Sequence, residues 1–419
     1  MAFNFNEQSD RRHSDSVKWN KYAENVLPMW VADMDFPTAP CVLEALHERV
    51  EQGIFGYGAA PDDLFDVVIG HLKQRYQWEV KPEWIIPLPG VVSGLNLAVR
   101  AFSAQDERSL APSPIYPPFY KAAELAGRAQ QKIPLVLKEG RWVMDLEAVE
   151  SGMRGDEALL MLCNPQNPGG TVYRREELMA QLAFAERHDL IVCSDEIHSE
   201  LILEPGLAHV PFASLNNRAA QRSVTFISPS KTWNIAGLGA SLAIIPNPEL
   251  HRRFAMARMG IVPNVDVLAL TAATAAWRDG EPWRQALIAH LQKQRSRLCN
   301  AINAMPGLRV VPPEATYLAW VDASALPVND PWHHFLQHGL AFSPGKEFGD
   351  SRFVRINFAC TEATLTEAIA RMQRAVEACG LYLFACDDVF NGPGMELDGH
   401  RAVGDRKRRV WQPLALAFR

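Results

Sequence analysis

The sequence has few cysteines, no long uncharged apolar run and no excess of basic residues. Its seven cysteines among 419 residues include no Cys-x-x-Cys pair, so we expect reduced, buried thiols in a cytoplasmic protein. No apolar run is long enough to cross a bilayer, and the polar start MAFNFNEQSDRRHSDSVKWN lacks an apolar leader, so we expect no membrane span and no secretory signal. The net charge of −6 gives no reason to expect a nucleic-acid partner.

The composition is that of an ordinary globular protein. Hydrophobic residues make up 48% of the chain and charged residues 21%. A chain of 419 residues is long for one domain and long enough to form two. No repeat of fixed period is visible. These features exclude collagen-like, disordered, disulfide-scaffold and membrane classes, but they name no function.

The middle of the chain alternates short apolar runs with helical stretches. Helical spacing of apolar residues is seen first at 41–53 and 63–76. From about residue 85 onward, apolar runs bounded by Gly, Pro and Asn predict buried parallel strands joined by helices, at 109–111, 159–163, 190–193, 224–227 and 241–245. The expected fold class is therefore α/β, with a mostly parallel central sheet and helices on both faces.

After about residue 278 the pattern changes to a smaller α+β domain. We expect a long helix at 283–305, and a last helix in which Thr364 and Glu367 have capping-box spacing. Short strands are expected between them at 308–311, 317–321 and 353–358. The predicted organisation is an N-terminal arm (1–45) packing with the small domain, a large domain (46–278), the small domain (279–385) and a mobile tail (386–419). The tail holds a basic run at 405–409. Such a run can signal nucleic-acid or partner binding, but we interpret it as a solvated extension.

Four polar motifs follow four of the predicted strands. Because the carboxyl ends of parallel strands meet at one edge of a sheet, we expect these motifs to converge on one crevice. They are Ser-Pro-Ile-Tyr (113–116), Asn-Pro-Gln-Asn-Pro-Gly-Gly (164–170), Ser-Asp-Glu-Ile-His (194–198) and Ser-Pro-Ser-Lys (228–231).

Individually, the residues of these motifs are weak signals. Lys231 follows a strand in a small, hydroxyl-rich turn, where a lysine can be desolvated and reactive, although most lysines are solvated surface charges. Asp195 at a strand end is either a helix cap or a fixed anion facing a ligand. Asn167 is either a turn former or a ligand donor.

Together the motifs resemble the fold-type I pyridoxal-phosphate (PLP) enzymes of the aminotransferase class I/II superfamily. The pattern is Asn-Pro-x-Asn-Pro-Gly-Gly, then Ser-Asp-Glu, then Ser-x-Ser-Lys, with Arg355 in Phe-Val-Arg-Ile-Asn-Phe (353–358). Met-Trp-Val-Ala-Asp-Met-Asp-Phe (29–36), Ser-Asp-Glu-Ile-His-Ser-Glu (194–200) and Ser-Lys-Thr-Trp-Asn-Ile-Ala-Gly (230–237) resemble the cystathionine β-lyase branch named for MalY and PatB. The resemblance spans about residues 19–380.

The resemblance implies roles for five residues around the PLP ring. Lys231 would form the Schiff base with PLP and later take the substrate Cα proton. Asp195 would keep the pyridine nitrogen protonated, so that the ring accepts electrons. Asn167 would bond the ring hydroxyl oxygen, and Tyr116 would stack on the ring face. His198 falls where many relatives have a tyrosine, and its role stays open between this oxygen and a structural one.

The resemblance also implies a phosphate site. A glycine-containing turn (90–94) is expected to precede a helix at 95–102, whose start offers free N–H groups. Many aminotransferases carry an arginine eight residues after the lysine, but here that position is Gly239, so the phosphate charge must be balanced elsewhere. Tyr57 matches a tyrosine that reaches the phosphate from a neighbouring subunit, which implies a homodimer with shared sites. The expected phosphate donors are Val92, Ser93, Ser228 and Ser230.

The same resemblance places the substrate between Arg355 and Trp30. Arg355 would bind the α-carboxylate through its fork, although a strand arginine can also simply face solvent. Trp30 and its neighbours would line the substrate mouth. Asp33 and Asp35 lie in that segment and receive no catalytic step.

The reaction that the branch implies is carbon–sulfur β-elimination. L-Cystathionine or a related cysteine S-conjugate would yield a thiol, pyruvate and ammonia, with Lys231 or a nearby phenol, such as that of Tyr116, protonating the leaving sulfur. Two alternatives remain open from the sequence: an aminotransferase of the same fold, and a regulatory protein that uses the fold as a binding surface. No metal site is expected.

Overall fold

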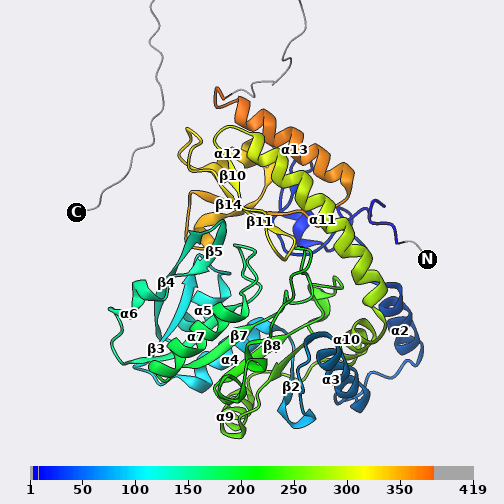
Figure 1. Cartoon of the computed structure of the whole chain (residues 1–419). Helices are drawn as coiled ribbons and strands as arrows, with labels where there is room; N and C mark the ends of the chain where they lie inside the picture. Colours follow the sequence, from blue (N-terminus) through cyan, green and yellow to red (C-terminus); the bar gives the residue numbers. More distant parts are fainter. Residues whose placement is uncertain (1–2, 8, 382–419) are drawn as a thin grey trace, which may run out of the picture. The chain divides into compact units, whose positions relative to one another are not determined.

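A computed structural model describes residues 3–7 and 9–381, and its core is an eight-stranded sheet (Figure 1). The expected tail, with Cys386 and the basic run, lies outside the described residues. The strand order is β2-β9-β8-β7-β6-β3-β4-β5. The strands are β2 (Ile85–Leu88), β3 (Arg108–Ser113), β4 (Ala129–Lys138), β5 (Arg141–Met144), β6 (Glu157–Cys163), β7 (Ile191–Asp195), β8 (Ser223–Ile227) and β9 (Ser241–Ile244).

Five neighbouring strands at the centre of this sheet, β8, β7, β6, β3 and β4, are parallel. The expectation of a parallel strand at 241–245 is wrong, because β9 runs antiparallel to both β8 and β2. The short connection from β8 to β9 contains no crossover helix, so the chain must reverse direction there. The carboxyl ends of β3, β6, β7 and β8 therefore lie on one edge, and β9 does not share it.

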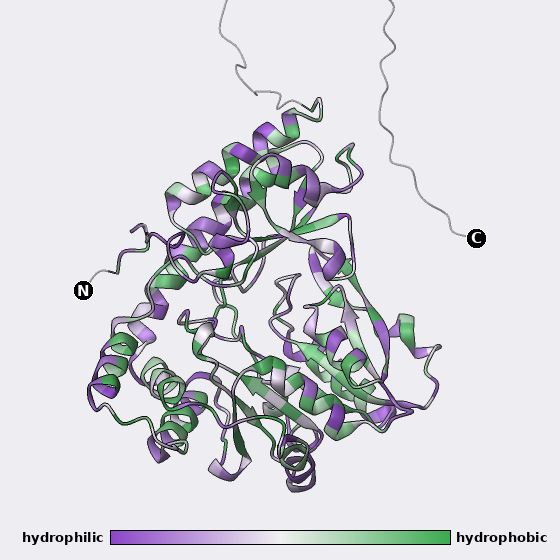
Figure 2. Cartoon of the chain, turned by 180° about the vertical axis from the view of Figure 1, so that it is seen from behind, coloured by the Kyte–Doolittle hydropathy of each residue, from purple (hydrophilic) through white to green (hydrophobic). Residues whose placement is uncertain are grey.

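Alternate residues of the central strands enter different hydrophobic cores, because side chains of a strand point to opposite faces. On β6, Leu159 and Met161 pack in a core with α4 (Val91–Phe102) and α9 (Pro248–Arg258). Leu160 and Leu162 pack on the other side with α7 (Arg175–Arg187). Figure 2 shows hydrophobic residues concentrated on these strands. Helices thus cover both faces, and the expected α/β fold class is confirmed.

A second sheet of four antiparallel strands has the order β10-β11-β14-β13. Its strands are β10 (Arg309–Val310), β11 (Leu318–Asp322), β13 (Ser343–Pro344) and β14 (Phe353–Asn357). The long helix α11 (Glu281–Ala304) contacts α13 (Glu362–Glu377), and the two lie side by side in Figure 1. From the N-terminal segment, β1 (Leu27–Pro28) pairs in parallel with β12 (Leu340–Ala341).

Two expected helix starts are wrong. The last helix is capped by Thr361, whose hydroxyl accepts the Thr364 N–H, and Thr364 lies inside the helix rather than at its cap. The helix expected from residue 95 begins at Val91, because Gly90 supplies the N-cap with a φ of 148°. Val92 and Ser93 are therefore in the first helical turn, where backbone N–H groups have no acceptor within the helix.

The remaining helices lie on the outside of the two sheets. Near the N-terminal segment, α2 and α3 pack on α10. The bounds are α1 (Val17–Asn20), α2 (Pro40–Glu51), α3 (Asp62–Tyr76), α5 (Pro118–Leu125), α6 (Glu147–Glu150), α8 (Asn217–Gln221), α10 (Val267–Asp279) and α12 (Pro331–Gln337). The expected domain boundaries within residues 3–381 stay predictions.

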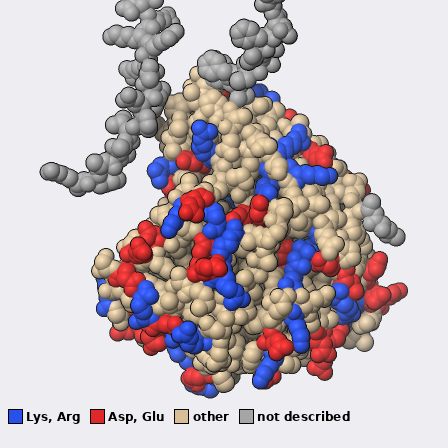
Figure 3. Space-filling view, viewed as in Figure 1, with Lys and Arg blue, Asp and Glu red and all other residues tan. Residues whose placement is uncertain are grey.

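The surface carries charges of both signs. Basic and acidic side chains are interspersed on the face shown in Figure 3. Among the described residues, no helix combines the length and the hydropathy that a membrane crossing requires.

Candidate active site

Eleven of the twelve residues that the sequence singled out line one cavity of about 500 Å³. The cavity lies where β3, β6, β7 and β8 end, so the four motifs do converge as the parallel strands require. The eleven are Trp30, Val92, Ser93, Tyr116, Asn167, Asp195, His198, Ser228, Ser230, Lys231 and Arg355. Their roles are taken up residue by residue below.

Lys231 follows β8 and turns its amine toward the N-terminal segment. Its Nζ donates a hydrogen bond to the carbonyl oxygen of Ala32 at 2.7 Å. Burial lowers the pKa of Lys231 to about 8, and the nearby charge of Arg355 acts in the same direction, against the opposing charges of Asp33 and Asp195. An amine with this pKa is partly unprotonated near neutral pH, as a nucleophile or a base must be.

Asp195 ends β7 as a buried carboxylate. Its Oδ1 accepts the Ile197 N–H at 3.1 Å, and no cation among the described residues forms an ion pair with it. Burial therefore raises the pKa of Asp195 to about 7. A buried carboxylate with no ion pair in the described part of the chain fits the protonated ring nitrogen of PLP, which would supply a positive charge beside it.

Arg355 lies on β14 and faces the cavity, so it is not a solvent-facing strand arginine. It is buried, and its guanidinium donates to the Asn167 side-chain oxygen at 3.1 Å and to the Trp30 carbonyl at 3.0 Å. It lies over the ring of Phe348, 4.6 Å from the ring centre. Burial lowers its pKa to about 10, so it stays charged near neutral pH and its Nε–H has no partner in the described chain. An incoming carboxylate can accept a hydrogen bond from this Nε–H.

His198 is buried and uncharged near neutral pH. Burial, followed by the charges of Lys231 and Arg355, lowers its pKa to about 3. Its ring packs edge-on against Tyr317 with ring centres 6.4 Å apart, and its Nδ1 has no hydrogen-bond partner among the described residues. A neutral imidazole of this kind can bond a polar ligand atom, but the structure leaves its role a prediction.

Tyr116 and Asn167 are held together by their backbones. The Tyr116 N–H donates to the Asn167 carbonyl at 3.1 Å, which fixes the end of β3 against the loop after β6. Burial raises the pKa of the Tyr116 phenol, so the hydroxyl keeps its proton and is able to donate one. Both residues therefore face the cavity as hydrogen-bonding groups.

The expected phosphate donors form a cradle at the start of α4. Val92 and Ser93 lie in its first turn, and the hydroxyls of Ser228 and Ser230 are 2.8 Å apart on the neighbouring turn. The twelve-residue helix α4 directs its positive dipole end toward the cavity. These donors fit the phosphate group of PLP. The carboxylate of Asp195 fits the ring nitrogen at the other end of the coenzyme.

Tyr57 is the one expected site residue that does not line the cavity. Its side chain is fully exposed and it follows the exposed apolar residues Ile54 and Phe55. Within a single chain, therefore, Tyr57 contributes nothing to the site.

Sequence reasoning missed three residues that surround Arg355 and Lys231. Tyr317 donates to the Ala32 carbonyl at 3.0 Å, and Ser343 donates to the Trp30 carbonyl at 2.8 Å. Phe348 lies under the Arg355 guanidinium. Ser343 reaches the site because β13 pairs with β14 in a register that sets Ser343 opposite Arg355, and no local sequence signal encodes that pairing.

Comparison with known proteins gives the site a family. The model of the family described as aminotransferase class I and II matches residues 24–372. The cystathionine β-lyase PatB of Bacillus subtilis (strain 168) is 38% identical over 387 residues, which covers 89% of this chain and 100% of PatB. A solved structure of OvoB is 56% identical with a TM-score of 0.88, covering 89% of this chain and 99% of OvoB.

A third relative is cystalysin from Treponema denticola, whose crystal structure contains pyridoxal 5′-phosphate. It is 30% identical with a TM-score of 0.86, and the match covers 90% of this chain and 100% of cystalysin. The chain therefore belongs to the aminotransferase class I and II family. Within that family its place is in the branch of PatB, as the sequence motifs predicted.

Proposed function

We propose that this protein is a PLP-dependent carbon–sulfur β-lyase. It would cleave L-cystathionine or a related cysteine S-conjugate to a thiol, pyruvate and ammonia. The observation that carries the proposal is one cavity lined by a lysine, by a buried carboxylate that forms no ion pair with any described residue, and by a buried arginine: Lys231, Asp195 and Arg355.

Each of these three residues has a defined task at a defined atom. Arg355 would hold the substrate α-carboxylate with its fork, which orients the Cα–H bond. Lys231 would attach the coenzyme and, once released, take the proton from Cα. Asp195 would hold the proton on the ring nitrogen. PLP, when bound, supplies an electron sink for the pair left at Cα.

The elimination balances with water as the second reactant. The bond between Cβ and sulfur breaks, the electron pair leaves with sulfur, and a proton from Lys231 or from the phenol of Tyr116 makes the free thiol. Water takes part in forming pyruvate and ammonia from the remaining three-carbon unit. Lys231 and Tyr116 line the same cavity, so both candidate proton donors are within the site.

The relatives support the reaction class. They do not define the group that the substrate carries on its sulfur atom. PatB is named a cystathionine β-lyase and cystalysin holds PLP. The chain shares 56% identity with OvoB against 38% with PatB, so a panel of cysteine S-conjugates is needed beside cystathionine. The panel should vary the group on sulfur while keeping the α-amino acid that Arg355 would bind.

One experiment separates the lyase from an aminotransferase of the same fold. The purified holoenzyme is incubated with cystathionine and the panel in the absence of any keto acid. Steady production of pyruvate, ammonia and thiol supports the lyase. A single half-turnover that leaves the coenzyme in its aminated form contradicts it and supports the aminotransferase.

We further propose a homodimer in which Tyr57 of each subunit completes the other subunit's phosphate site. Its full exposure, beside exposed Ile54 and Phe55, supports a partner surface there. Mixing a Lys231→Ala chain with a Tyr57→Ala chain should restore activity, because one site of each hybrid then has both residues. No recovery in confirmed hybrids would contradict sharing. The cytoplasmic location expected from the sequence stays a prediction, which cell fractionation tests.

A further inference from the structure

Two backbone carbonyls of the N-terminal segment, those of Trp30 and Ala32, accept hydrogen bonds from the two cationic side chains of the site. The Trp30 carbonyl accepts from Arg355 at 3.0 Å and from the Ser343 hydroxyl at 2.8 Å. The Ala32 carbonyl accepts from the Lys231 amine at 2.7 Å and from the Tyr317 hydroxyl at 3.0 Å. Each carbonyl thus receives one cationic donor and one hydroxyl donor.

The carbonyls between and after them are fixed by one side chain. The Asn357 Nδ2 donates to the Val31 carbonyl at 2.5 Å and to the Asp33 carbonyl at 2.6 Å. The Asn357 Oδ1 in turn accepts the Ala359 N–H at 2.8 Å, which fixes the amide orientation. All four carbonyls of residues 30–33, here named the carbonyl bracket, therefore have assigned partners.

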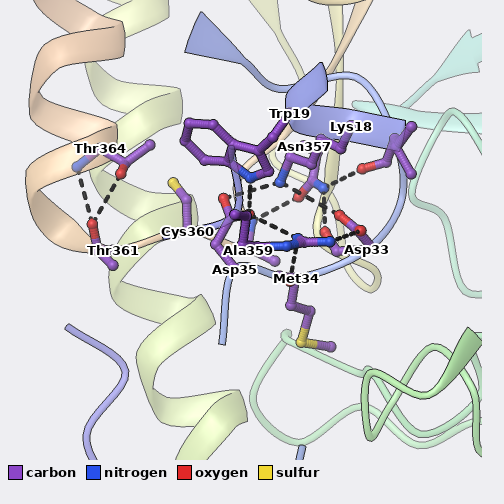
Figure 4. A network of polar contacts seen from close by, with 12 residues as sticks. Lys18, Trp19, Asp33, Met34, Asp35, Asn357, Ala359, Cys360, Thr361 and Thr364 are labelled. Carbon is purple, nitrogen blue, oxygen red and sulfur yellow. Dashed lines mark hydrogen bonds and ion pairs between the residues drawn. The ribbon is translucent and has the colours of Figure 1, made fainter. Parts of the chain in front are cut away.

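A partly buried charge cluster contacts the chain at and just after the carbonyl bracket, through Asp33 and Asp35 (Figure 4). Lys18, whose side chain is 1% exposed, contacts Asp35 at 3.0 Å and Asp33 at 3.6 Å. Arg11 contacts the same two carboxylates, at 2.8 Å to Asp33 and 3.1 Å to Asp35, and Trp19 donates to Asp35. The two cations and the two carboxylates balance in charge, and their contacts join residues 11–19 to Asp33 and Asp35.

We infer that four side chains act as positioning residues that hold the carbonyl bracket in place: Asp33, Asn357, Tyr317 and Ser343. The Trp30 carbonyl of the bracket then orients the guanidinium of Arg355. The Ala32 carbonyl accepts a hydrogen bond from the amine of Lys231 once that amine is released. This deepens the proposed function and rests on it for its kinetic test. The bracket orients the two cations through different carbonyls, Arg355 through that of Trp30 and Lys231 through that of Ala32. The two carbonyls therefore affect different steps, because Arg355 acts in substrate binding and Lys231 acts in proton transfer.

Two matched variants test this separation, each deleting one buried hydroxyl. Tyr317→Phe removes the second donor to Ala32 and should lower kcat by about two- to tenfold with little change in KM. Ser343→Ala removes the second donor to Trp30 together with a direct acceptor of the Arg355 guanidinium at 3.2 Å, and it should raise KM by about two- to tenfold with little change in kcat. Because the ring of Tyr317 stays, and Ser343 is small, both variants are expected to fold.

A merely structural role for these hydroxyls would not divide the two parameters in this way. The control is Arg108→Met, which breaks the Arg108–Asp156 ion pair at the opposite end of β3 and should leave kcat and KM unchanged. Parallel changes in both parameters, or none, for the two hydroxyl variants would overturn the inference.

A second readout does not depend on lyase activity. The full chain freed of PLP is labelled at a series of pH values with a small acylating reagent, and the peptide containing Lys231 is quantified by mass spectrometry. The charges that face Lys231 are Arg355, Asp33 and Asp195. Asp33→Asn removes a charge that favours the ammonium, so the pH midpoint of Lys231 labelling should fall.

The Arg108→Met chain should label like the unaltered protein. An unshifted midpoint in folded Asp33→Asn protein would show that the amine does not lie at the bracket. If the labelling shift is found and lyase turnover is absent, the bracket stands and the proposed function fails. If lyase turnover is found, but the labelling midpoint does not shift and kcat and KM do not change separately, the proposed function stands and the bracket inference fails.

Discussion

Gly239 lies directly against the backbone carbonyl of Pro89, so that an added Cβ would stand 2.8 Å from that oxygen. Its φ of +65° is in the left-handed region that side chains rarely adopt. The family resemblance implies that this position corresponds to the arginine that many aminotransferases use for the phosphate. The backbone therefore opposes a side chain here, and we predict that the phosphate relies on the start of α4, on the serine hydroxyls and on Tyr57 of a second subunit.

Gly239→Ala is expected to lower the free energy of unfolding by about 1–2 kcal/mol, because the left-handed backbone and the contact with Pro89 both oppose a Cβ. Urea denaturation measures this change. Gly237→Ala is the control, since its added Cβ meets nothing within 4 Å. Equal stability of the two variants would contradict the strain at position 239.

Lys231→Ala is expected to abolish both the visible absorbance of bound PLP linked to lysine and the elimination activity, while the circular dichroism of the protein stays unchanged. The physical reason is that, among residues 3–7 and 9–381, Lys231 is the one lysine that lines the cavity. Lys121→Ala, at an exposed lysine on α5, serves as the control. Retained turnover in the Lys231 variant would remove this residue from the mechanism.

Asp195 makes the PLP-free protein lose stability as the pH rises. Its folded pKa of about 7 lies above the ordinary aspartate value of 3.8, so the folded state binds the proton more tightly than the unfolded state does. The contribution of this carboxyl is thus fully present below about pH 4 and lost toward pH 7. Relative to Asp195→Asn, the melting temperature of the unaltered chain should fall as the pH rises from about 4 to about 7. A constant difference between the two proteins over this range would contradict the raised pKa.

With PLP present, Asp195→Asn should retain some coenzyme yet lower kcat by at least about tenfold, because an amide cannot balance the protonated ring nitrogen. Rapid-mixing measurement of Cα deprotonation with deuterated substrate checks the step. An unchanged deprotonation rate would refute the assigned role of the carboxylate.

Arg355→Lys is expected to raise KM for cysteine S-conjugates by about tenfold or more with a smaller change in kcat, because an ammonium cannot form the two parallel bonds of a guanidinium. Steady-state kinetics on an amino acid and on its amide analogue measure this. The variant should discriminate less between the two substrates than the unaltered enzyme does. Undiminished preference for the free carboxylate would assign its recognition to another residue.

The convergence of the four motifs could be predicted from the sequence, because it follows from strand direction alone. Asp195 and Lys231 stand at the ends of adjacent parallel strands, and apolar runs with polar ends are visible in the chain. The direction of β9 could not be predicted, since an apolar run has the same pattern in a parallel and an antiparallel strand. The partners of Arg355 depend on strand register and on contacts across more than three hundred residues, which local patterns do not encode.

The hydrogen bond from Arg355 to Trp30 joins residues that are 325 positions apart. During synthesis on the ribosome, the segment that carries Trp30 emerges early and has to wait for β14, near the end of the described chain. A nascent polypeptide halted before this strand would hold Lys231 and Asp195 but would lack Arg355 and the Asn357 amide that binds the carbonyl bracket. Completion of the site is therefore one of the last events in the biogenesis of this protein.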